Sequence, residues 1–574
     1  IKVYVGNNLI LDFLLQSIFW ITLLSLIPKV DKNNLKNTNL AIFFTALLII
    51  LHFLGEERHY LNQIKNFDSS LKLTNFFLLS IFLSVVLVLL IFRDVIKERL
   101  PNIINFLPFL FLFQGTYSSI NFNFWLLIVS FFGINFLLDN KISKYTLIVF
   151  AFFLSFWILN IGENSFIFDI DKLKGFVSSS LNVYSVLFWG SILFLAISGI
   201  NFIIENSKDS FNLNLFKRNF LISGSLVVIL GYISASNQIL NFLSYYFLGL
   251  NKKASESLQS VGQNAWRGLS PSAESIGEYF GFTVLLVILI SFFKNYRLNY
   301  FEVILLLINL YGLYESNNFA SALTLVLLII TAFLFKKIIS RKFRILYLVF
   351  LLIIGLYSYL AIFNTNSFNG ASSKLLDEAT SVAEINNLPT NNYGQTALDQ
   401  FRYGEILANE EVLKNVSSSL YFFMDKYNEN KISNLPNITS LISIVSIPLN
   451  RTEKWGVFIA KYNPDIGVLL FGYGPGQLAD YYLGFPTKAN TGLILPHSSL
   501  LSYLLFIGII GLLIALKYIL TNIYYNKDDY LFVYLNIFLI FNLLKSDSIL
   551  YVNSFIFFLV INNLYKLTSK EDSL

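Results

Sequence analysis

The chain has 574 residues and a small net charge of +6; 55% of its residues are apolar, 17% are aromatic and 13% are charged. Soluble proteins carry about 25% charged residues, so this chain has too few charges to cover a soluble surface of its size. It has no Cys, which excludes disulfides, thiolate metal sites and thiol nucleophiles. We therefore expect an all-α polytopic membrane protein.

Apolar runs of about 20 residues, the length that spans a bilayer, recur along the chain. Because many runs follow the first, we interpret the first as a membrane span and not as a removed signal peptide. The chain starts with Ile1 and not with Met, which leaves the completeness of the N-terminus open. We expect about 12–15 transmembrane helices, with candidate spans at 9–27, 38–54, 73–92, 103–119, 121–138, 145–161, 183–205, 219–236, 279–293, 301–315, 319–335, 345–363, 498–516, 531–545 and 549–564.

Lys and Arg residues concentrate in every second short loop, the distribution that marks loops kept in the cytoplasm. The strongest such loop is KKIISRKFR, from Lys336 to Arg344. The other loops of this set contain Lys29, Lys32, Lys36, Arg93, Lys97, Arg99, Lys141, Lys144, Lys208, Lys217, Arg218, Lys294, Arg297, Lys517, Lys527, Lys566 and Lys570. The alternate short loops contain Lys2, Arg58, Lys65, Lys72, Lys172, Lys174 and Lys545. The first set is therefore predicted to be cytoplasmic.

This orientation divides the chain into three membrane parts and two outer loops. The membrane parts are an N-terminal bundle, 1–236, a second group of helices, 279–363, and C-terminal helices, 498–574. Two segments, 237–278 and 364–497, face away from the cytoplasm, and the second is long enough to fold as a small domain. We expect a bacterial inner membrane protein whose large loop faces the periplasm or the exterior.

Most residues that suggest chemistry lie in the segment 450–513. Arg451 and Trp455 lie one helical turn apart, and a Gly-Pro turn follows at 472–476. His497 directly precedes an apolar span. The sequence contains no Walker loop, no Rossmann fingerprint and no internal repeat.

The order of these motifs resembles that of the O-antigen ligase and O-antigen polymerase family of membrane glycosyltransferases. The resemblance covers roughly the C-terminal half of the chain. It rests on Arg267-Gly268-Leu269-Ser270-Pro271, Ser316-Asn317-Asn318-Phe319-Ala320, Arg451 with Trp455, Pro464, Gly472-Tyr473-Gly474-Pro475-Gly476, His497-Ser498 and Gly508-Ile509-Ile510-Gly511-Leu512.

The resemblance implies transfer of a glycan from a polyprenyl diphosphate, such as undecaprenyl diphosphate, to an acceptor hydroxyl outside the cytoplasm. Lipopolysaccharide and other surface polysaccharides are the implied products. The donor carries its own leaving group, which agrees with the missing nucleotide-binding loops. The implied reaction is inverting and uses no metal or other cofactor. The implied partners are the bilayer, the lipid-linked donor and a glycan, lipid or protein acceptor, with no nucleic acid.

Such a reaction needs cations that stabilise the diphosphate as negative charge develops on it. Arginine offers planar, two-pronged donors and stays charged near lipid. We assign this role to Arg267 and Arg451; the alternative is that each anchors a helix end at the membrane interface. Arg402 is a further candidate, although a surface pair with Glu405 also accounts for it.

The acceptor proton needs a base, and the pKa of His suits that task near neutral pH. His497 is our candidate for the base or for a group that orients the acceptor; capping the following helix is the alternative. His52 lies inside an expected span and His59 in a polar loop, so neither is a candidate.

Glycines and carboxylates complete the predicted site. Gly474 and Gly476 allow close approach of the donor, although a plain turn between the loop and a re-entrant segment is the simpler interpretation of this run. Glu274 and Glu278 are one turn apart and placed to orient Arg267. We expect Gly508 and Gly511 to allow close helix packing. Acidic pairs that could hold a metal occur at Glu56-Glu57 and at Asp169 with Asp171, where solvated loops are the simpler interpretation.

Two other functions stay open at this point. A transporter or a flippase for lipid-linked sugars would place charges or broken helices inside the membrane. A peptidoglycan-type polymerase would share the membrane architecture and use a muropeptide lipid as donor.

Overall fold

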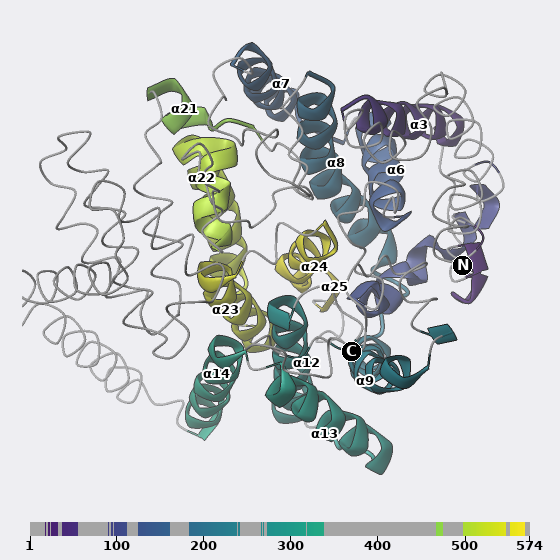
Figure 1. Ribbon diagram of the computed structural model, residues 1–574, viewed down its shortest axis with the longest axis vertical. Coiled ribbons are helices and arrows are strands. Elements are labelled where there is room, and N and C mark those ends of the chain that lie inside the picture. The colour runs from purple at the N-terminus through teal and green to yellow at the C-terminus, as the bar shows by residue number, and fades with distance from the viewer. Residues whose placement is uncertain are drawn as a thin grey trace, which may run out of the picture.

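The computed structural model describes all-helical parts of the chain (Figure 1). The described residues are 18, 21–22, 25–31, 37–55, 90, 93–95, 97–111, 124–139, 141–160, 183–237, 239–240, 266, 268, 273–294, 296–316, 318–337, 466–474, 498–527, 529–546 and 552–568. No strand occurs among them.

The helices are α3 (Thr38–Gly55), the 3₁₀-helix η1 (Leu107–Phe111), α6 (Phe124–Leu138), α7 (Lys144–Leu159), α8 (Val183–Ser207), α9 (Leu213–Ser236), α12 (Ala273–Phe293), α13 (Tyr300–Glu315), α14 (Phe319–Lys337), α21 (Ile466–Phe471), α22 (Ser499–Tyr525), α23 (Tyr530–Lys545), α24 (Val552–Asn562) and α25 (Tyr565–Thr568).

Four described stretches are long and apolar enough to cross a membrane: Val186–Ser207, Leu213–Ile233, Glu274–Phe293 and Ser499–Tyr525. Five shorter apolar helices accompany them at Thr38–Leu48, Ile128–Leu138, Lys144–Leu159, Ala320–Leu334 and Tyr530–Lys545. These findings support a polytopic helical membrane protein. The expected spans 73–92 and 345–363 lie almost wholly outside the described residues, so the predicted total of 12–15 spans stays a prediction.

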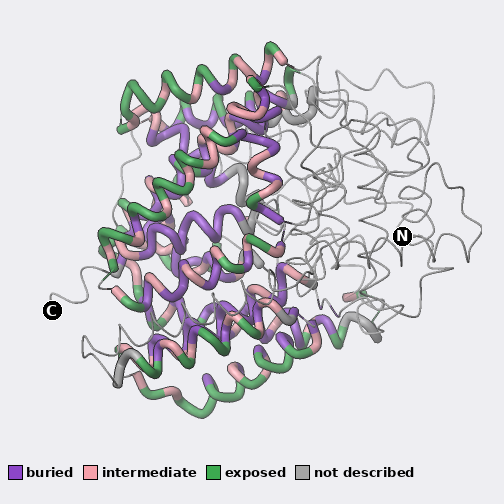
Figure 2. Tube along the Cα trace, turned by 90° about the vertical axis from the view of Figure 1, so that its left-hand side faces the viewer, coloured by how far each residue is buried: buried purple, intermediate pink, exposed green. Residues whose placement is uncertain are grey.

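Helix α12 lies at the centre of the C-terminal part of the bundle. It packs against α9, α13, α14 and α23. Most of its apolar side chains are buried, and Phe280, Phe282 and Leu285 are completely so. Along the tube in Figure 2, buried positions line the inner sides of the helices and exposed ones their outer sides. A helix that is apolar all round, as this one is, is expected in the core of such a bundle.

Helix α12 begins earlier than the sequence indicated. The predicted outer loop 237–278 ends inside it, because α12 starts at Ala273 and not near residue 279. The polar stretch at its start is compatible with a helix, since Glu274 in the first turn interacts favourably with the helix dipole. Glu274 and Glu278 therefore belong to a helix end and not to a loop.

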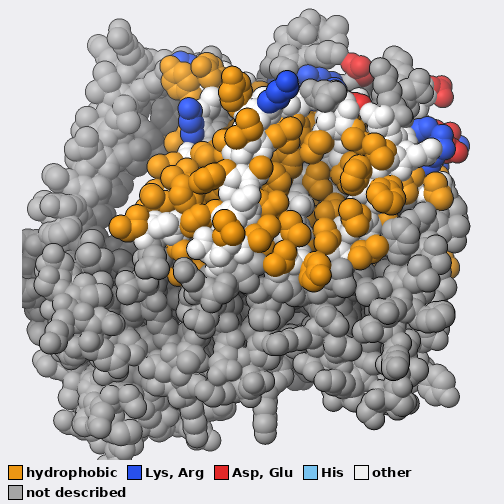
Figure 3. All heavy atoms as spheres, turned by 90° about the horizontal axis from the view of Figure 1, so that it is seen from above, with side chains coloured by type: hydrophobic (Ala, Val, Ile, Leu, Met, Phe, Trp, Pro, Cys, Tyr) orange, Lys and Arg blue, Asp and Glu red, His pale blue; other side chains and the backbone are white. Residues whose placement is uncertain are grey.

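Most of the described cations gather at one end of the bundle, which we call the basic end. Figure 3 shows Lys and Arg side chains along one edge of a broad apolar band. The ion pairs there join Lys29 to Glu98 at 2.9 Å and Lys141 to Glu205 at 3.3 Å. Which side of the membrane this end faces stays a prediction.

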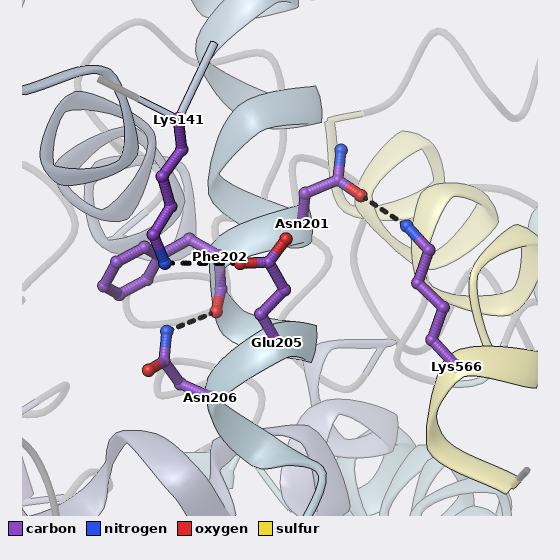
Figure 4. Close-up of polar contacts among 6 residues, drawn as sticks. All are labelled: Lys141, Asn201, Phe202, Glu205, Asn206 and Lys566. Atoms are coloured by element: carbon purple, nitrogen blue, oxygen red, sulfur yellow. Dashed lines mark hydrogen bonds and ion pairs between the residues drawn. The ribbon is translucent and has the colours of Figure 1, made fainter. Parts of the chain in front are cut away.

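The basic end is held together by contacts between segments far apart in the chain (Figure 4). The Lys566 ammonium donates to Asn201 Oδ1 at 3.1 Å, which joins α25 to α8. On the other side of α8, Lys141 reaches Glu205. Burial lowers the pKa of Lys566, partly offset by the neighbouring carboxylate of Glu205. The C-terminal helices are therefore attached to the N-terminal half at this end.

Buried asparagines connect the helices inside the bundle. Asn522 of α22 donates to Asn562 of α24 at 2.8 Å, and Asn562 donates to Asn536 of α23 at 2.9 Å. Asn309 of α13 donates to the Leu221 carbonyl of α9 at 3.1 Å. Hydrogen bonds of this kind between membrane helices contribute about 0.6–2 kcal/mol each.

Candidate functional site

Five of the predicted site residues lie outside the described residues: Arg267, Arg402, Arg451, Gly476 and His497. Three others are described: Glu274, Glu278 and Gly474. The expected large loop domain 364–497 is described only at 466–474. The site is therefore built here from the residues that flank the predicted cations and from the described part of the glycine turn.

The chain neighbours of Arg267 lie at the end of the bundle opposite the basic end. Trp266 stacks on Tyr232 in the last turns of α9, with ring centroids 5.4 Å apart. Gly268 has a positive φ of 57°, and a Cβ there would lie 2.8 Å from the Val227 carbonyl oxygen. Only glycine adopts this conformation without strain so close to the α9 backbone.

A chain of polar contacts at this opposite end connects four helices. Asn318, between α13 and α14, donates to the Glu274 carbonyl of α12 at 3.0 Å. Ser321 of α14 donates to Asn542 of α23 at 2.7 Å. The Ser499 hydroxyl of α22 donates to the Ser546 carbonyl at 2.7 Å, directly after α23. These contacts connect the start of α22, which follows His497 in the chain, through α23 and α14 to the start of α12, where Glu274 lies.

Glu274 and Glu278 are both half-buried on the first turns of α12. Between them, Ser275 and Gly277 face the bundle, and a Cβ on Gly277 would lie 2.7 Å from Ser316 Oγ. The two carboxylates therefore share a face of one helix end, as their spacing predicted. Their proposed role in orienting Arg267 stays a prediction.

The glycine turn is part of a backbone junction with α22. The Tyr473 amide donates to the Leu505 carbonyl at 2.9 Å, and the Gly474 amide donates to the Phe506 carbonyl at 2.8 Å. Gly472 and Gly474 have φ values of 77° and 99°. A Cβ on Gly472 would lie 2.2 Å from the Phe506 carbonyl oxygen. Glycine is required here by close backbone packing.

Helix α22 is broken where this junction forms. Gly508 has φ 63° and ψ −175°, which are not helical values, while the residues on both sides are helical. A Cβ on Gly508 would lie 2.4 Å from the Leu470 carbonyl. At 1.5 Å rise per residue, Gly508 lies about 14 Å along the helix from Ser499, deep within a bilayer that α22 spans. Irregular backbone at such depth requires protein partners, and Tyr473 and Gly474 are two of them.

Helix α7 holds α21 against this break. The Trp157 indole Nε1 donates to the Phe471 carbonyl at 2.8 Å. The Phe471 ring makes edge contacts with Phe152 and Phe153, with centroids 5.1 and 5.5 Å apart. Gly474 packs beside the Trp157 ring, and a Cβ on Gly474 would lie 3.2 Å from Trp157 Cγ. Residues 466–474, expected in an outer loop, are thus packed between α7 and α22.

Sequence reasoning missed two parts of this junction, Trp157 and the break at Gly508. We expected Gly508 to allow close helix packing. Gly508 does lie close to another segment, but at a break in α22 and not within a continuous helix. The available signal was the coincidence of two glycine-rich runs, 472–476 and 508–511, in one short part of the chain. The aromatic run of α7 carried no comparable signal.

The described residues include no group of three His, Cys, Asp or Glu side chains that could hold a metal ion. The acidic pairs at Glu56-Glu57 and at Asp169 with Asp171 lie outside the described residues. What the described part offers is a network of buried polar contacts at the helix ends and a break within α22. Searches against protein-family models, curated proteins and solved structures found no match to this chain.

Proposed function

We propose that the protein transfers or polymerises a glycan from a polyprenyl diphosphate donor onto an acceptor hydroxyl at the membrane surface opposite the basic end. One structural observation supports this proposal beyond the sequence resemblance. Trp266 and Gly268, the neighbours of Arg267, pack on the last turns of α9, while Ser499, which follows the neighbour of His497, bonds to the carbonyl just after α23, although some 230 residues separate the two places in the chain. A site built from Arg267 and His497 requires that both lie at one end of the bundle.

In this proposal, Arg267 and Arg451 bind the diphosphate and stabilise the charge that develops as the glycosidic bond breaks. His497 accepts the proton of the attacking hydroxyl. Glu274 and Glu278 orient Arg267. Gly474 and Gly476 allow close approach of the donor diphosphate to the backbone, and Gly474 is positioned by its packing on Trp157.

The direct test is glycan transfer by purified protein in lipid vesicles, with polyprenyl-diphosphate-linked oligosaccharide as donor and defined acceptors. We expect Arg451→Ala and His497→Ala to insert normally and to lose transfer by at least a hundredfold, so that the lipid-linked donor accumulates in cells. His59→Ala and Arg58→Ala serve as matched controls and retain transfer. Normal transfer by either site variant would show that these assignments are wrong.

A chelator separates this mechanism from a metal-dependent one. We expect transfer to be the same with and without EDTA, because arginines supply the positive charge. Loss of transfer on chelation, restored by a divalent cation, would move the site to the acidic pairs at Glu56-Glu57 or at Asp169 with Asp171.

A second candidate function, a transporter or lipid-linked sugar flippase, is favoured by one observation. The break of α22 at Gly508, with residues 466–474 packed against it, is the kind of discontinuous helix that many transporters use for their substrates. The same vesicles distinguish the two functions. Movement of a solute or of the donor lipid across the bilayer, with no glycan transfer to any acceptor, would support the transporter.

A further inference from the structure

Two aromatic side chains in the described part of the chain bury a hydrogen-bond donor that has no partner there. They are Trp266, through its indole Nε1, and Tyr503, through its hydroxyl. Buried Trp and Tyr usually find a partner for this group. Trp266 directly precedes Arg267, and Tyr503 lies six residues after His497. Each unpaired donor is therefore close in the chain to a residue of the predicted site.

The size of a Tyr side chain distinguishes its unpaired hydroxyl from other buried groups of the described helices. Some of those groups belong to side chains that make another polar contact, as the Lys217 ammonium does with Glu302 at 2.9 Å. Others are Ser hydroxyls, as at Ser130 and Ser291. A Ser hydroxyl can turn toward the backbone of its own helix, whereas a Tyr hydroxyl is too far from that backbone to bond to it.

The Tyr503 ring is held in place, so its hydroxyl cannot turn to find a partner. The ring stacks on Phe555 of α24, with ring centroids 6.4 Å apart and an angle of 24° between the planes. It also contacts Phe506, about one turn further along α22, edge to face at 6.0 Å. A Phe at position 503 would make the same contacts without burying an unpaired hydroxyl. The hydroxyl therefore lowers the stability of the protein unless a ligand bonds to it.

The position of Tyr503 along α22 indicates which ligand that is. Helix α22 is long and apolar enough to cross a membrane, so its start at Ser499 lies near the headgroup level. Tyr503 lies four residues, or about 6 Å, further along. Long side chains on a helix lean toward its N-terminus, which brings the hydroxyl back toward the level of Ser499. A polyprenyl diphosphate places its phosphates at this level, its chain in the apolar layer and its glycan in water.

We propose that the Tyr503 hydroxyl donates a hydrogen bond to a phosphate oxygen of the polyprenyl diphosphate donor. This inference rests on the proposed function and adds a ligand-binding residue to its site. Hydrogen bonds to charged groups are roughly twice as strong as those between neutral groups, so an anionic oxygen is a favourable partner for a buried hydroxyl. A residue that breaks a local rule of stability, as Tyr503 does, is expected at a functional site.

The test measures thermal unfolding of the purified chain in detergent, with and without undecaprenyl diphosphate. The variant is Tyr503→Phe, which removes one oxygen atom and keeps the ring. The matched control is Tyr518→Phe on the same helix, because the Tyr518 hydroxyl has a partner and donates to Asn563 Oδ1 at 2.8 Å. A second series replaces undecaprenyl diphosphate by dioleoylphosphatidylglycerol, an ordinary anionic phospholipid with one phosphate.

Without ligand, we expect Tyr503→Phe to melt at or above the temperature of the unchanged protein, and Tyr518→Phe to melt below it. Undecaprenyl diphosphate is expected to raise the melting temperatures of the unchanged protein and of Tyr518→Phe with the same apparent Kd. For Tyr503→Phe, we expect an apparent Kd that is higher by about tenfold or more, the loss that follows from removing a hydrogen bond to a charged group. Dioleoylphosphatidylglycerol is expected to bind Tyr503→Phe and the unchanged protein alike.

Three results would overturn this inference alone. The first is a lower melting temperature of ligand-free Tyr503→Phe, because the hydroxyl would then have a partner within the protein. The second is an equal Kd for undecaprenyl diphosphate in Tyr503→Phe and in the unchanged protein. The third is an equally large loss of affinity for dioleoylphosphatidylglycerol, which would assign the hydroxyl to ordinary lipid headgroups. If the unchanged protein does not bind undecaprenyl diphosphate, the proposed function fails together with this inference.

Discussion

At the scale of single residues, the junction at Gly508 depends on two glycines that meet backbone to backbone. Gly472 and Gly508 lie opposite each other, and the ideal Cβ of Gly508 would be 2.5 Å from the Gly472 nitrogen. Both have a positive φ. Neither position therefore tolerates a side chain, for steric and for conformational reasons together.

We predict that Gly508→Ala lowers the stability of the protein by at least about 1–3 kcal/mol, the usual cost of a forced backbone conformation. The measurement is thermal unfolding of the protein in detergent. Gly467→Ala is the control, because its Cβ would meet only the Phe156 ring at 3.3 Å. Equal melting temperatures for the two variants would contradict the requirement for glycine at the break.

The buried ion pair between Lys217 of α9 and Glu302 of α13, 2.9 Å apart, leads to a second prediction at this scale. Lys217→Met removes one partner and leaves a buried carboxylate without compensation, which costs about 3–5 kcal/mol. The double variant Lys217→Met with Glu302→Leu removes both charges and is expected to recover most of that loss. Chemical denaturation of the two variants measures the difference. A double variant no more stable than Lys217→Met would show that the pair matters through shape and not through charge.

At the scale of elements, α21 is a six-residue helix whose position depends on its neighbours. It is too short to be stable alone, since isolated helices of this length do not persist in water. The Trp157 hydrogen bond to Phe471 and the aromatic contacts of α7 supply what the helix itself lacks.

We predict that Trp157→Phe loosens α21 while leaving the rest of the bundle intact. The substitution keeps an aromatic ring beside Gly474 but removes the indole donor to the Phe471 carbonyl. Hydrogen exchange is expected to become at least tenfold faster at the amides of Tyr473 and Gly474 and to stay unchanged in α12. Trp189→Phe, in α8, is the control, since the Trp189 ring packs on Phe188 and not on Phe471. Unchanged exchange at 473 and 474 would contradict this role of Trp157.

The element scale also shows what the sequence could predict. Long apolar runs such as α8 and α13 were found nearly at their true positions, because membrane insertion depends on the same hydropathy that the sequence displays. Polar helix ends were missed: α9 and α12 each begin six residues before the expected span. Apolar content does not mark the polar first turns of a helix, although Asn212, which caps α9, was a usable signal.

The candidate site was less predictable than the spans. The sequence indicated a glycine turn at 472–476, and the described part shows positive φ values at Gly472 and Gly474. It did not indicate which helix receives the turn, because Trp157 and Gly508 come from distant parts of the chain. Side-chain roles for Arg267, Arg451 and His497 stay predictions.

At the scale of the whole molecule, the segregation of cations at one end predicts the orientation in the membrane. Single-Cys variants are suitable, since the chain has no Cys. We expect Lys208→Cys to react with a membrane-impermeant maleimide only after the inner membrane is opened, and Glu315→Cys to react in intact cells stripped of their outer barrier. Labelling of both positions from the same side of the membrane would contradict the prediction that positions 208 and 315 face opposite sides.

The junction between the glycine turn and α22 has a consequence for how the chain tolerates change. The Gly474 amide donates a hydrogen bond to the Phe506 carbonyl of α22, and Ser498 immediately precedes the first residue of α22. The stretch between them therefore starts and ends on the same helix, at points about 12 Å apart along its axis. Doubling the length of such a stretch adds only about 0.6 kcal/mol of closure entropy. Short insertions between Gly476 and His497 are therefore expected to leave the fold of the described helices intact.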